Sequence, residues 1–392
     1  MIDNIKKELC TGCNACFNIC SENCIEMLID NSGFRYPKVD YQKCSKCRKC
    51  LITCPSLNKK IIKENFILPK IFAAWTLDEE TRMNSTSGGI FSELAKNVIQ
   101  TGGLVVGAKY NSDHLVVHDI VDNVENIEKL RQSKYIQSDI ENIYKKIKNY
   151  LISQREVAFC GSPCQVAGLL NYLGQTYANL TTFDFVCRGM NSPKAYRKYL
   201  DMLENKYQSK IKKVWFKNKT LGWNRFSTRI EFNNGDIYLE DRYRDLFMRG
   251  YIEENLYMRP CCFECKYKEF PRVADITLAD FWGVANIDTS LDADKGTSLI
   301  LINSKKGEEL FHKIKDRIYQ RETSLEFALP GNRCILESAK PNPRSEMFLK
   351  MLDNAEFDRC FKKYAQNRTI RKIKNKFFRG IQIIREKLTQ KK

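Results

Sequence analysis

Eight cysteines near the N-terminus form one spacing pattern written twice, and this repeat constrains the chain more than any other feature. The first copy is followed 34 residues later by the second: Cys10, Cys13, Cys16 and Cys20, then Cys44, Cys47, Cys50 and Cys54. Three cysteines separated by two residues each can surround one cofactor within a tight loop. Zinc sites usually use two cysteine pairs separated by a longer loop. The repeat therefore predicts thiolate-bound clusters rather than zinc.

The C-x2-C-x2-C-x3-C run is typical of bacterial ferredoxins, in which the fourth cysteine ligates the other cluster. The spacing thus predicts two 4Fe-4S clusters with crossed ligand sets. We expect one cluster on Cys10, Cys13, Cys16 and Cys54, and the other on Cys44, Cys47, Cys50 and Cys20. A ninth cysteine, Cys24, is expected to be buried beneath the clusters.

Length and composition place this unit within a larger protein. A chain of 392 residues with ordinary apolar content predicts two or three domains. It contains no run of about 18 apolar residues, so no membrane-spanning helix is expected. The seventeen cysteines are an odd number and residues 1–20 hold no apolar signal segment. A disulfide framework is therefore not favoured, and a reducing, cytoplasmic location is expected.

The cysteine repeat, the charge pattern and the spacing of apolar residues together predict four segments. Residues 1–57 form the ferredoxin-like domain, 58–70 a charged linker, 71–355 a mixed-sheet α/β domain, and 356–392 a basic helical tail. Strands are expected at 71–75, 104–108, 116–121, 157–160, 183–187 and 298–303, and helices at 90–99, 140–151, 165–173, 193–207 and 308–319. The predicted fold class is therefore α+β or α/β.

Four further cysteines stand where thiolates are commonly available. Cys164 follows a Gly-Ser-Pro turn at an expected helix start, Cys187 ends an expected strand, and Cys262 and Cys265 form a C-x2-C pair. Thiolates at strand ends and helix N-termini are accessible and electrostatically favoured. From the residues alone, a third cluster and buried structural thiols both remain open.

Six motifs in order resemble the coenzyme F420 hydrogenase/dehydrogenase beta-subunit family from about residue 71 to about residue 350. They are STSGGIFSEL (85–94), SKYIQS (133–138), GSPCQVAGLL (161–170), FVCRGMNSPKAYRKYL (185–200), RPCCFECKYK (259–268) and ADITLADFWGV (274–284). Members of the family bind FAD and carry a 4Fe-4S cluster in this domain. The resemblance implies that the third cluster is held by Cys164, Cys187, Cys262 and Cys265. Cys160 and Cys261 are rival ligands, whereas Cys334 and Cys360 are expected to be structural.

The resemblance also implies a flavin-binding domain. Its candidate FAD contacts are Ser85, Thr86, Ser87, Gly88 and Gly89, and also Ser133, Lys134 and Tyr135. Backbone N–H groups at a helix start can bind a pyrophosphate, although a Ser/Thr–Gly run there is usually a helix cap. The second patch could equally be an exposed turn. Residues 280–283 resemble the family motif GDFWG with Ala279 in place of its first glycine, and no catalytic acid or base is predicted.

The C-terminal tail carries much of the net charge of +18. Residues 362–392 contain twelve Lys or Arg and one acid, Glu386, with apolar residues at helical spacing between Ile370 and Leu388. Such a basic amphipathic helix suits peripheral attachment to the inner face of a membrane. Packing on the protein's own core and a solvated tail remain alternatives. Nucleic-acid binding is not expected, because no recognition motif accompanies the charge.

These features predict an iron–sulfur flavoprotein oxidoreductase. It would move electrons between a ferredoxin-like carrier or redox partner subunit and a two-electron acceptor, through 4Fe-4S clusters and FAD. The acceptor would be coenzyme F420 or an unknown substrate, with surface-polysaccharide biosynthesis as one setting that the resemblance suggests. A non-catalytic electron-transfer subunit of a larger complex is the main alternative, and a zinc-stabilised nucleic-acid-binding protein is a third.

Overall fold

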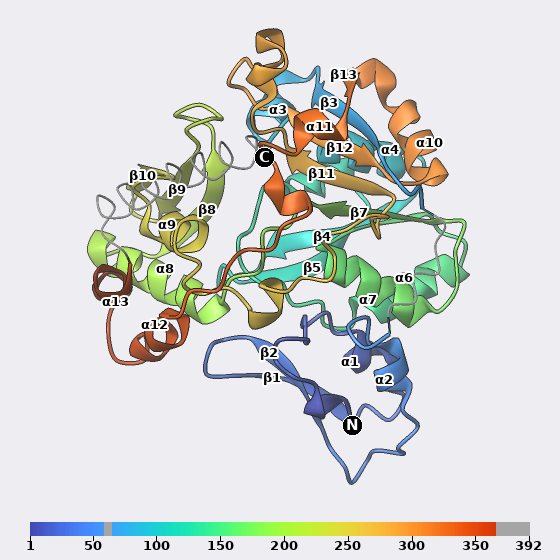
Figure 1. The fold of residues 1–392 in the computed structure, drawn as a ribbon, viewed down its shortest axis with the longest axis vertical. Coiled ribbons are helices and arrows are strands. Elements are labelled where there is room, and N and C mark those ends of the chain that lie inside the picture. Colours follow the sequence, from blue (N-terminus) through green and yellow to red (C-terminus); the bar gives the residue numbers. More distant parts are fainter. Residues whose placement is uncertain (59–64, 366–392) are drawn as a thin grey trace, which may run out of the picture.

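The computed structural model describes residues 1–58 and 65–365. Residues 1–58 form a small N-terminal unit, and residues 65–365 form a large mixed α/β body with a side lobe (Figure 1). This arrangement confirms the predicted fold class of a small ferredoxin-like region followed by a mixed-sheet domain. The amphipathic helix predicted between Ile370 and Leu388 lies outside the described residues. Within the described part of the chain, no helix has the length and apolarity to cross a membrane.

The N-terminal unit repeats its local structure as it repeats its sequence. Its elements are the 3-10 turn η1 (Ile2–Asn4), α1 (Ala15–Ile19), β1 (Ile25–Ile29), β2 (Arg35–Val39) and α2 (Lys49–Thr53), with β1 and β2 antiparallel. Each helix starts after a residue in the left-handed region, Asn14 at φ 61° and Arg48 at φ 60°. The two equivalent cysteine loops therefore turn in the same way.

The body is built on an eight-stranded sheet in the order β13-β3-β12-β11-β7-β6-β4-β5. In chain order its strands are β3 (Lys70–Thr76), β4 (Leu104–Tyr110), β5 (Val116–Val121), β6 (Val157–Cys160), β7 (Leu180–Phe185), β11 (Ile276–Asp280), β12 (Ser298–Ile302) and β13 (Ile318–Thr323). The neighbours β4, β6, β7 and β11 are parallel, and the remaining pairs are antiparallel. The carboxyl ends of the four parallel strands thus meet at one edge, where open α/β sheets commonly bind ligands.

Helices cover both faces of this sheet. α4 (Ile90–Gln100) and α10 (Lys305–Lys313) pack on one face, and α6 (Ile143–Ile152) and α7 (Pro163–Leu173) pack on the other. Successive side chains of β4 point to opposite faces of the sheet. Val105 packs on the α4 side, whereas Leu104 and Val106 pack on the α6–α7 side. Short helices α3 (Glu79–Met83), α5 (Ile127–Leu130) and α11 (Leu325–Ala328) lie in the connections.

The side lobe joins a three-stranded sheet to four helices around an aromatic core. Its elements are β8 (Ile211–Asn218), β9 (Ser227–Phe232), β10 (Ile237–Asp241), α8 (Pro193–Tyr207), α9 (Leu246–Ile252), α12 (Ser345–Met351) and α13 (Phe357–Tyr364). Phe247 lies within 6.4 Å, ring centre to ring centre, of Tyr199, Tyr257 and Phe357. α13 follows the predicted boundary at residue 356, and its Cys360 is fully buried in this core.

Most predicted elements are confirmed to within a few residues, with two corrections. The helix predicted at 308–319 is wrong at its end: α10 stops at Lys313, and β13 begins at Ile318. Residues 318–323 instead pair with β3 at the edge of the sheet. The Tyr319 ring stacks on the Trp75 ring with 4.1 Å between ring centres. The strand predicted at 183–187 is β7 at 180–185, so Cys187 lies in the loop after the strand.

Candidate metal and cofactor sites

The first four-thiol site lies within the N-terminal unit. Cys10, Cys13, Cys16 and Cys54 line one cavity of about 300 Å³, hereafter the first cavity. All four side chains are buried. Three of them come from the first cysteine run and the fourth comes from the end of the second, so the folded chain brings together the crossed set that the spacing predicts.

The second cavity, of about 330 Å³, lies at the other end of the same unit. It is lined by Cys20, Cys44, Cys47 and Cys50, again the predicted crossed set, and also by Cys24. The Cys24 sulfur lies 3.3 Å from the Cys20 sulfur, and Cys24 is buried. Cys47 is exposed, and hydrogen bonds from the Lys49 backbone and the Ser45 side chain lower its pKa.

The third cavity, of about 630 Å³, opens at the carboxyl edge of the parallel strands. Its six cysteines are Cys164, Cys187, Cys261, Cys262, Cys265 and Cys334. Cys164 follows β6 and stands in the first turn of α7, where Ser162 and Gln165 form a capping box. Cys187 follows the neighbouring strand β7, and the short turn η3 (Pro260–Cys262) carries the C-x2-C pair to the same place. The fold thus brings together the four thiols that the resemblance implied.

Two cysteines line the third cavity in addition to the four implied ligands. Cys261, which the sequence analysis named as a rival ligand, lines it, whereas the other rival, Cys160, is not among the lining residues. Cys334 also lines it and was expected to be structural. No spacing signal relates Cys334 to the other cysteines; the turn η7 (Arg333–Ile335) carries it to the cavity.

The buried thiols require a positive charge before they can ionise. Burial raises the pKa of Cys164 far above its usual range, and the neighbouring thiols of Cys187 and Cys265 raise it further. Burial likewise raises the pKa of Cys13 to about 12, with a contribution from Cys54. A cationic metal core would reverse this cost, because coordinated thiols deprotonate. The donor set of each cavity therefore fits a thiolate-bound cluster.

The thiols line the three cavities without converging on one point. Among residues 1–58 and 65–365, no three His, Cys, Asp or Glu side chains lie close enough together to hold a single metal ion.

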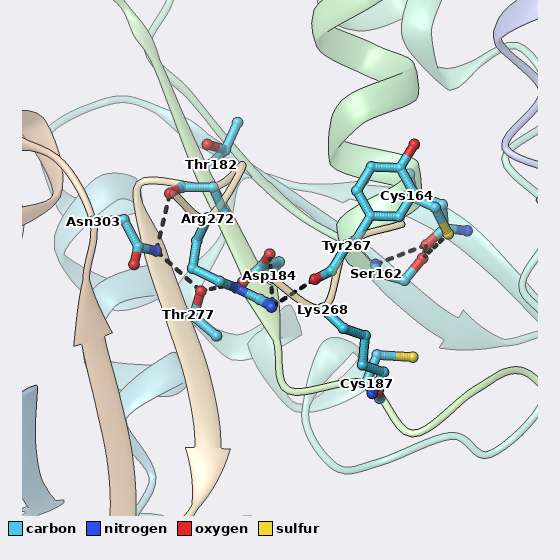
Figure 2. Close-up of polar contacts among 12 residues, drawn as sticks. Ser162, Cys164, Thr182, Asp184, Cys187, Tyr267, Lys268, Arg272, Thr277 and Asn303 are labelled. Carbon is cyan, nitrogen blue, oxygen red and sulfur yellow. Dashed lines mark hydrogen bonds and ion pairs between the residues drawn. The ribbon is translucent and has the colours of Figure 1, made fainter. Parts of the chain in front are cut away.

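Basic side chains surround the third cavity. Lys266, Lys268, Arg188 and Arg272 all line it. Lys268 donates hydrogen bonds to the backbone carbonyls of Cys187 and Cys334. Figure 2 shows Arg272 beside Asp184, with which it forms a buried ion pair at 3.3 Å. Glu8 and Glu264 also line the cavity, and Arg272 is balanced by Asp184, so Lys266, Lys268 and Arg188 are the cations that could offset the negative charge of a thiolate-bound cluster.

The first and third cavities adjoin one another. Thr11 lines both of them. Helix α1 of the N-terminal unit packs on α7 of the body (Figure 1). A Cβ atom at Gly168 of α7 would lie 3.0 Å from the Cys13 sulfur, so the glycine permits this close approach. The contact places a thiol of the first cavity directly against the helix that carries Cys164.

The residues predicted to contact FAD come from two loops that meet. The Thr86 hydroxyl lies 3.1 Å from the Ser133 hydroxyl and accepts a hydrogen bond from the Ser133 N–H. The local backbone structure requires a glycine at both glycine positions of the first loop. A Cβ at Gly88 would lie 2.4 Å from the Ala74 carbonyl oxygen, and Gly89 has a φ of +85°. The loop geometry thus needs both glycines whether or not a phosphate binds there.

Lys134 and Tyr135 point into the protein interior. The Lys134 ammonium donates hydrogen bonds to the carbonyls of Leu130, Arg131 and Gln132 at 2.8–3.4 Å, at the end of α5. Burial lowers the pKa of Lys134 to about 7. The Tyr135 ring contacts the ring of Tyr251 at 5.4 Å. These contacts give Lys134 a role in holding the loop that carries Ser133.

A buried ion pair beside these loops was not found from the sequence. Lys217, at a bulge near the end of β8 with φ 55°, pairs with Asp280 at the end of β11. Asp280 also accepts a hydrogen bond from the Trp223 indole at 2.9 Å. Trp223 stacks on Trp282 at 4.7 Å. A left-handed, bulged lysine paired at the carboxyl edge of a sheet is a candidate functional group.

Comparison with known families gives these sites a context. Residues 9–58 match the 4Fe-4S dicluster domain, and residues 154–326 match the family described as the C terminus of the coenzyme F420 hydrogenase/dehydrogenase beta subunit. The chain therefore carries an N-terminal 4Fe-4S dicluster domain followed by a domain of the coenzyme F420 hydrogenase/dehydrogenase beta-subunit family. These matches confirm the resemblance over residues 9–58 and 154–326, whereas the motifs at 85–94 and 133–138, which carry the FAD prediction, lie outside both matches.

A chain from the xenon-derivatised F420-reducing NiFe hydrogenase complex of Methanosarcina barkeri is similar at 17% identity, covering 77% of this chain and 94% of that one with a TM-score of 0.46. The comparison with curated proteins gave no match.

Proposed function

We propose that this protein is an iron–sulfur flavoprotein oxidoreductase that exchanges electrons between a one-electron carrier and a two-electron acceptor. One observation carries the proposal above the others: three separate cavities each gather four or more cysteines, and the first of them adjoins the third. Adjacent cluster sites at an interface are what a chain needs to pass electrons from one unit to the other.

The ligand assignments follow from the cavity linings. Cys10, Cys13, Cys16 and Cys54 would hold one 4Fe-4S cluster, Cys20, Cys44, Cys47 and Cys50 a second, and Cys164, Cys187, Cys262 and Cys265 a third. Cys24, Cys261 and Cys334 would then be neighbouring thiols that contribute to the surroundings of the clusters. When bound, clusters supply single electrons and a flavin can pair them for two-electron chemistry.

The contact between Thr86 and Ser133 supports a flavin site at the two meeting loops. The backbone at the start of α4 and the two hydroxyls would bind FAD phosphate oxygens. Lys134 would position the second loop through its three carbonyl contacts. Lys217 interacts with the Tyr135 hydroxyl as well as with Asp280, so this pair would place a buried ammonium group beside the flavin.

The relay is tested by removing one ligand of the third site. In Cys187→Ala protein, the N-terminal clusters should still be reduced by a one-electron donor, while flavin reduction through them should slow at least tenfold. Flavin reduction as fast as in the unaltered protein would contradict the relay. Cys360→Ala, which removes a buried thiol remote from the three cavities, is the matched control.

The family name supports a second candidate, because it describes beta subunits of hydrogenases and dehydrogenases. The chain would then transfer electrons only inside a larger complex. Substrate turnover by the isolated chain, with coenzyme F420 as the first acceptor to assay, would favour the enzyme. Reduction of clusters and flavin without turnover of any acceptor would favour the electron-transfer role.

A further inference from the structure

The two cysteine runs differ in the residues between their cysteines. At the positions related by the 34-residue repeat, Gly12, Asn14, Ala15 and Asn18 of the first run correspond to Lys46, Arg48, Lys49 and Ile52 of the second. The first set is small or neutral, whereas the second carries three positive charges and an isoleucine. The same backbone loop therefore presents two chemically different surfaces.

The first set forms an internal interface. All four residues are buried against the body. Asn14 donates a hydrogen bond to Asp139 at 3.0 Å, Asn18 donates to the Glu141 carbonyl at 2.8 Å, and a Cβ at Gly12 would lie 2.2 Å from the Gln137 amide. This face is the side of the first cluster loop that docks on the body, next to the third cavity.

The equivalent face of the second run is open. Lys46, Arg48 and Lys49 are exposed, and Ile52 retains 64% of its accessible surface. Cys47, between the first two cations, is the exposed cysteine of the second cavity, whereas every cysteine of the first cavity is buried. The second cavity therefore reaches the surface at the face that, in the first run, contacts the body.

The charge on this face is predominantly positive. Residues 41–54 contain four cations and no acid. Asp40 pairs with Lys43 at 3.2 Å, which leaves the other three cations of the loop outside that pair. Glu22, which also lines the second cavity, offsets part of the remainder. An apolar side chain surrounded by charge of one sign is the usual composition of a docking surface for an oppositely charged protein.

We propose that the face formed by Lys46, Arg48, Lys49 and Ile52 is the docking site of a small acidic one-electron carrier protein, such as an acidic ferredoxin. This inference rests on the proposed function and adds where electrons enter and which charge the donor carries. The carrier would place its cofactor over Cys47, so that electrons enter at the second cavity and pass through the first to the third. Positive charge at the entrance would raise the association rate by electrostatic steering.

The test measures cluster reduction by a reduced, net-negative 2(4Fe-4S) ferredoxin in stopped flow, with full-length anaerobically prepared protein. Salt is varied from about 0.01 M to about 1 M, over which the screening length falls from about 30 Å to about 3 Å. We expect the second-order rate of the unaltered protein to fall steeply with salt. Lys46→Glu/Arg48→Glu/Lys49→Glu should be at least tenfold slower at low salt, with a flat salt dependence.

Two controls separate docking from net charge and from cluster damage. Lys206→Glu/Lys212→Glu/Lys213→Glu makes the same change in net charge with exposed lysines of the side lobe, and its rate should stay within about twofold of the unaltered protein. Reduced methyl viologen, a small cation, should reduce the docking-face variant at least as fast as the unaltered protein. If the triple variant loses iron, the milder Lys46→Gln/Lys49→Gln variant takes its place.

The outcomes are distinguishable. A docking-face variant with full iron content and an unchanged rate and salt dependence with the acidic ferredoxin overturns the docking site while leaving the proposed function intact. Equal slowing by the side-lobe variant also overturns it, because the effect would then belong to the total charge. An unaltered protein without iron would instead overturn the proposed function.

Discussion

Arg259 donates a hydrogen bond from Nη2 to the Cys10 sulfur at 3.5 Å and another from Nε to the Cys10 carbonyl at 2.8 Å. The arginine is fully buried and lies over the Tyr36 ring at 4.3 Å. Its own carbonyl accepts a hydrogen bond from the Cys262 N–H at 3.0 Å. One residue therefore links a proposed ligand of the first cluster to a proposed ligand of the third.

Replacing Arg259 should lower the reduction potential of the first cluster. Hydrogen bonds to ligand sulfurs and nearby positive charge favour the reduced, more negative cluster. In Arg259→Gln protein we expect the ratio of reduced to oxidised cluster to fall at least tenfold at fixed potential, equivalent to about 59 mV for one electron. Electron paramagnetic resonance during a redox titration measures this shift.

Arg82→Gln is the matched control for that prediction. Arg82 is also buried, lies over the Trp75 ring at 4.6 Å and donates to the backbone carbonyl of Gly296 rather than to a cysteine. Its loss should reduce stability without shifting any cluster potential. Equal potentials in Arg259→Gln and unaltered protein would show that Arg259 only supports the interface.

Cysteine variants should separate ligands from neighbouring thiols at the third cavity. Cys262→Ala should lose about four irons per chain, because one cluster holds four. Cys261→Ala and Cys334→Ala should keep the full iron content, although both residues line the same cavity. Iron and acid-labile sulfide analysis measures the difference. Loss of a cluster in Cys261→Ala but not in Cys262→Ala would contradict the assignment and show that Cys261 is the ligand.

Breaking the Lys217–Asp280 ion pair should clearly lower the free energy of unfolding. Burial lowers the pKa of Lys217, but the Asp280 carboxylate outweighs this effect and the net pKa lies above that of an ordinary lysine. Asp280→Asn keeps an acceptor for Trp223 and leaves the lysine charge unpaired, so unfolding should become easier by about 3–5 kcal/mol.

Denaturant unfolding at equal iron content measures that cost. Asp119→Asn, which breaks the partly exposed pair of Asp119 with Lys109, should cost less than about 1 kcal/mol. Similar losses in the two variants would contradict the view that Lys217 and Asp280 form a buried, unscreened pair.

Lys134 should give the protein a stability that increases with pH. Its pKa is about 7 in the folded chain and about 10.4 when unfolded, so the unfolded state binds one more proton between these values. Stability from this group therefore rises with pH across that window and is lost as pH falls toward 7. In Lys134→Met protein, the slope of the unfolding free energy against pH should be smaller by about 1.4 kcal/mol per pH unit. An unchanged slope between about pH 7.5 and 9.5 would show that the folded lysine keeps its proton.

The cysteine spacing predicted the crossed thiol sets because local chain geometry determines them. Cys13 and Cys16 must share a loop, and the repeat of the run provides Cys54 from the second copy. The resemblance grouped Cys164 with Cys187, and both line one cavity because they follow neighbouring parallel strands. Each of these relationships follows from a local motif combined with a regular repeat or strand pairing.

Other parts of the site depend on tertiary contacts that leave no local pattern. Cys334 reaches the third cavity through a turn far from the other cysteines in sequence. The position of Lys217 depends on a bulge in β8, and that of Arg259 on two units packing together. The early end of α10 depends on β13 pairing with β3. In each case the deciding partner is distant along the chain.

The most direct measurement is an iron anomalous difference map of crystals of the anaerobically purified full-length protein. The account predicts three four-iron peaks, one within each cavity, with about twelve irons and one FAD per chain in solution. The peaks should be bounded by Cys54, Cys47 and Cys187 in the first, second and third cavities. Two iron peaks confined to the N-terminal unit, without flavin, would contradict the central claim that the cysteines of the body complete an electron path.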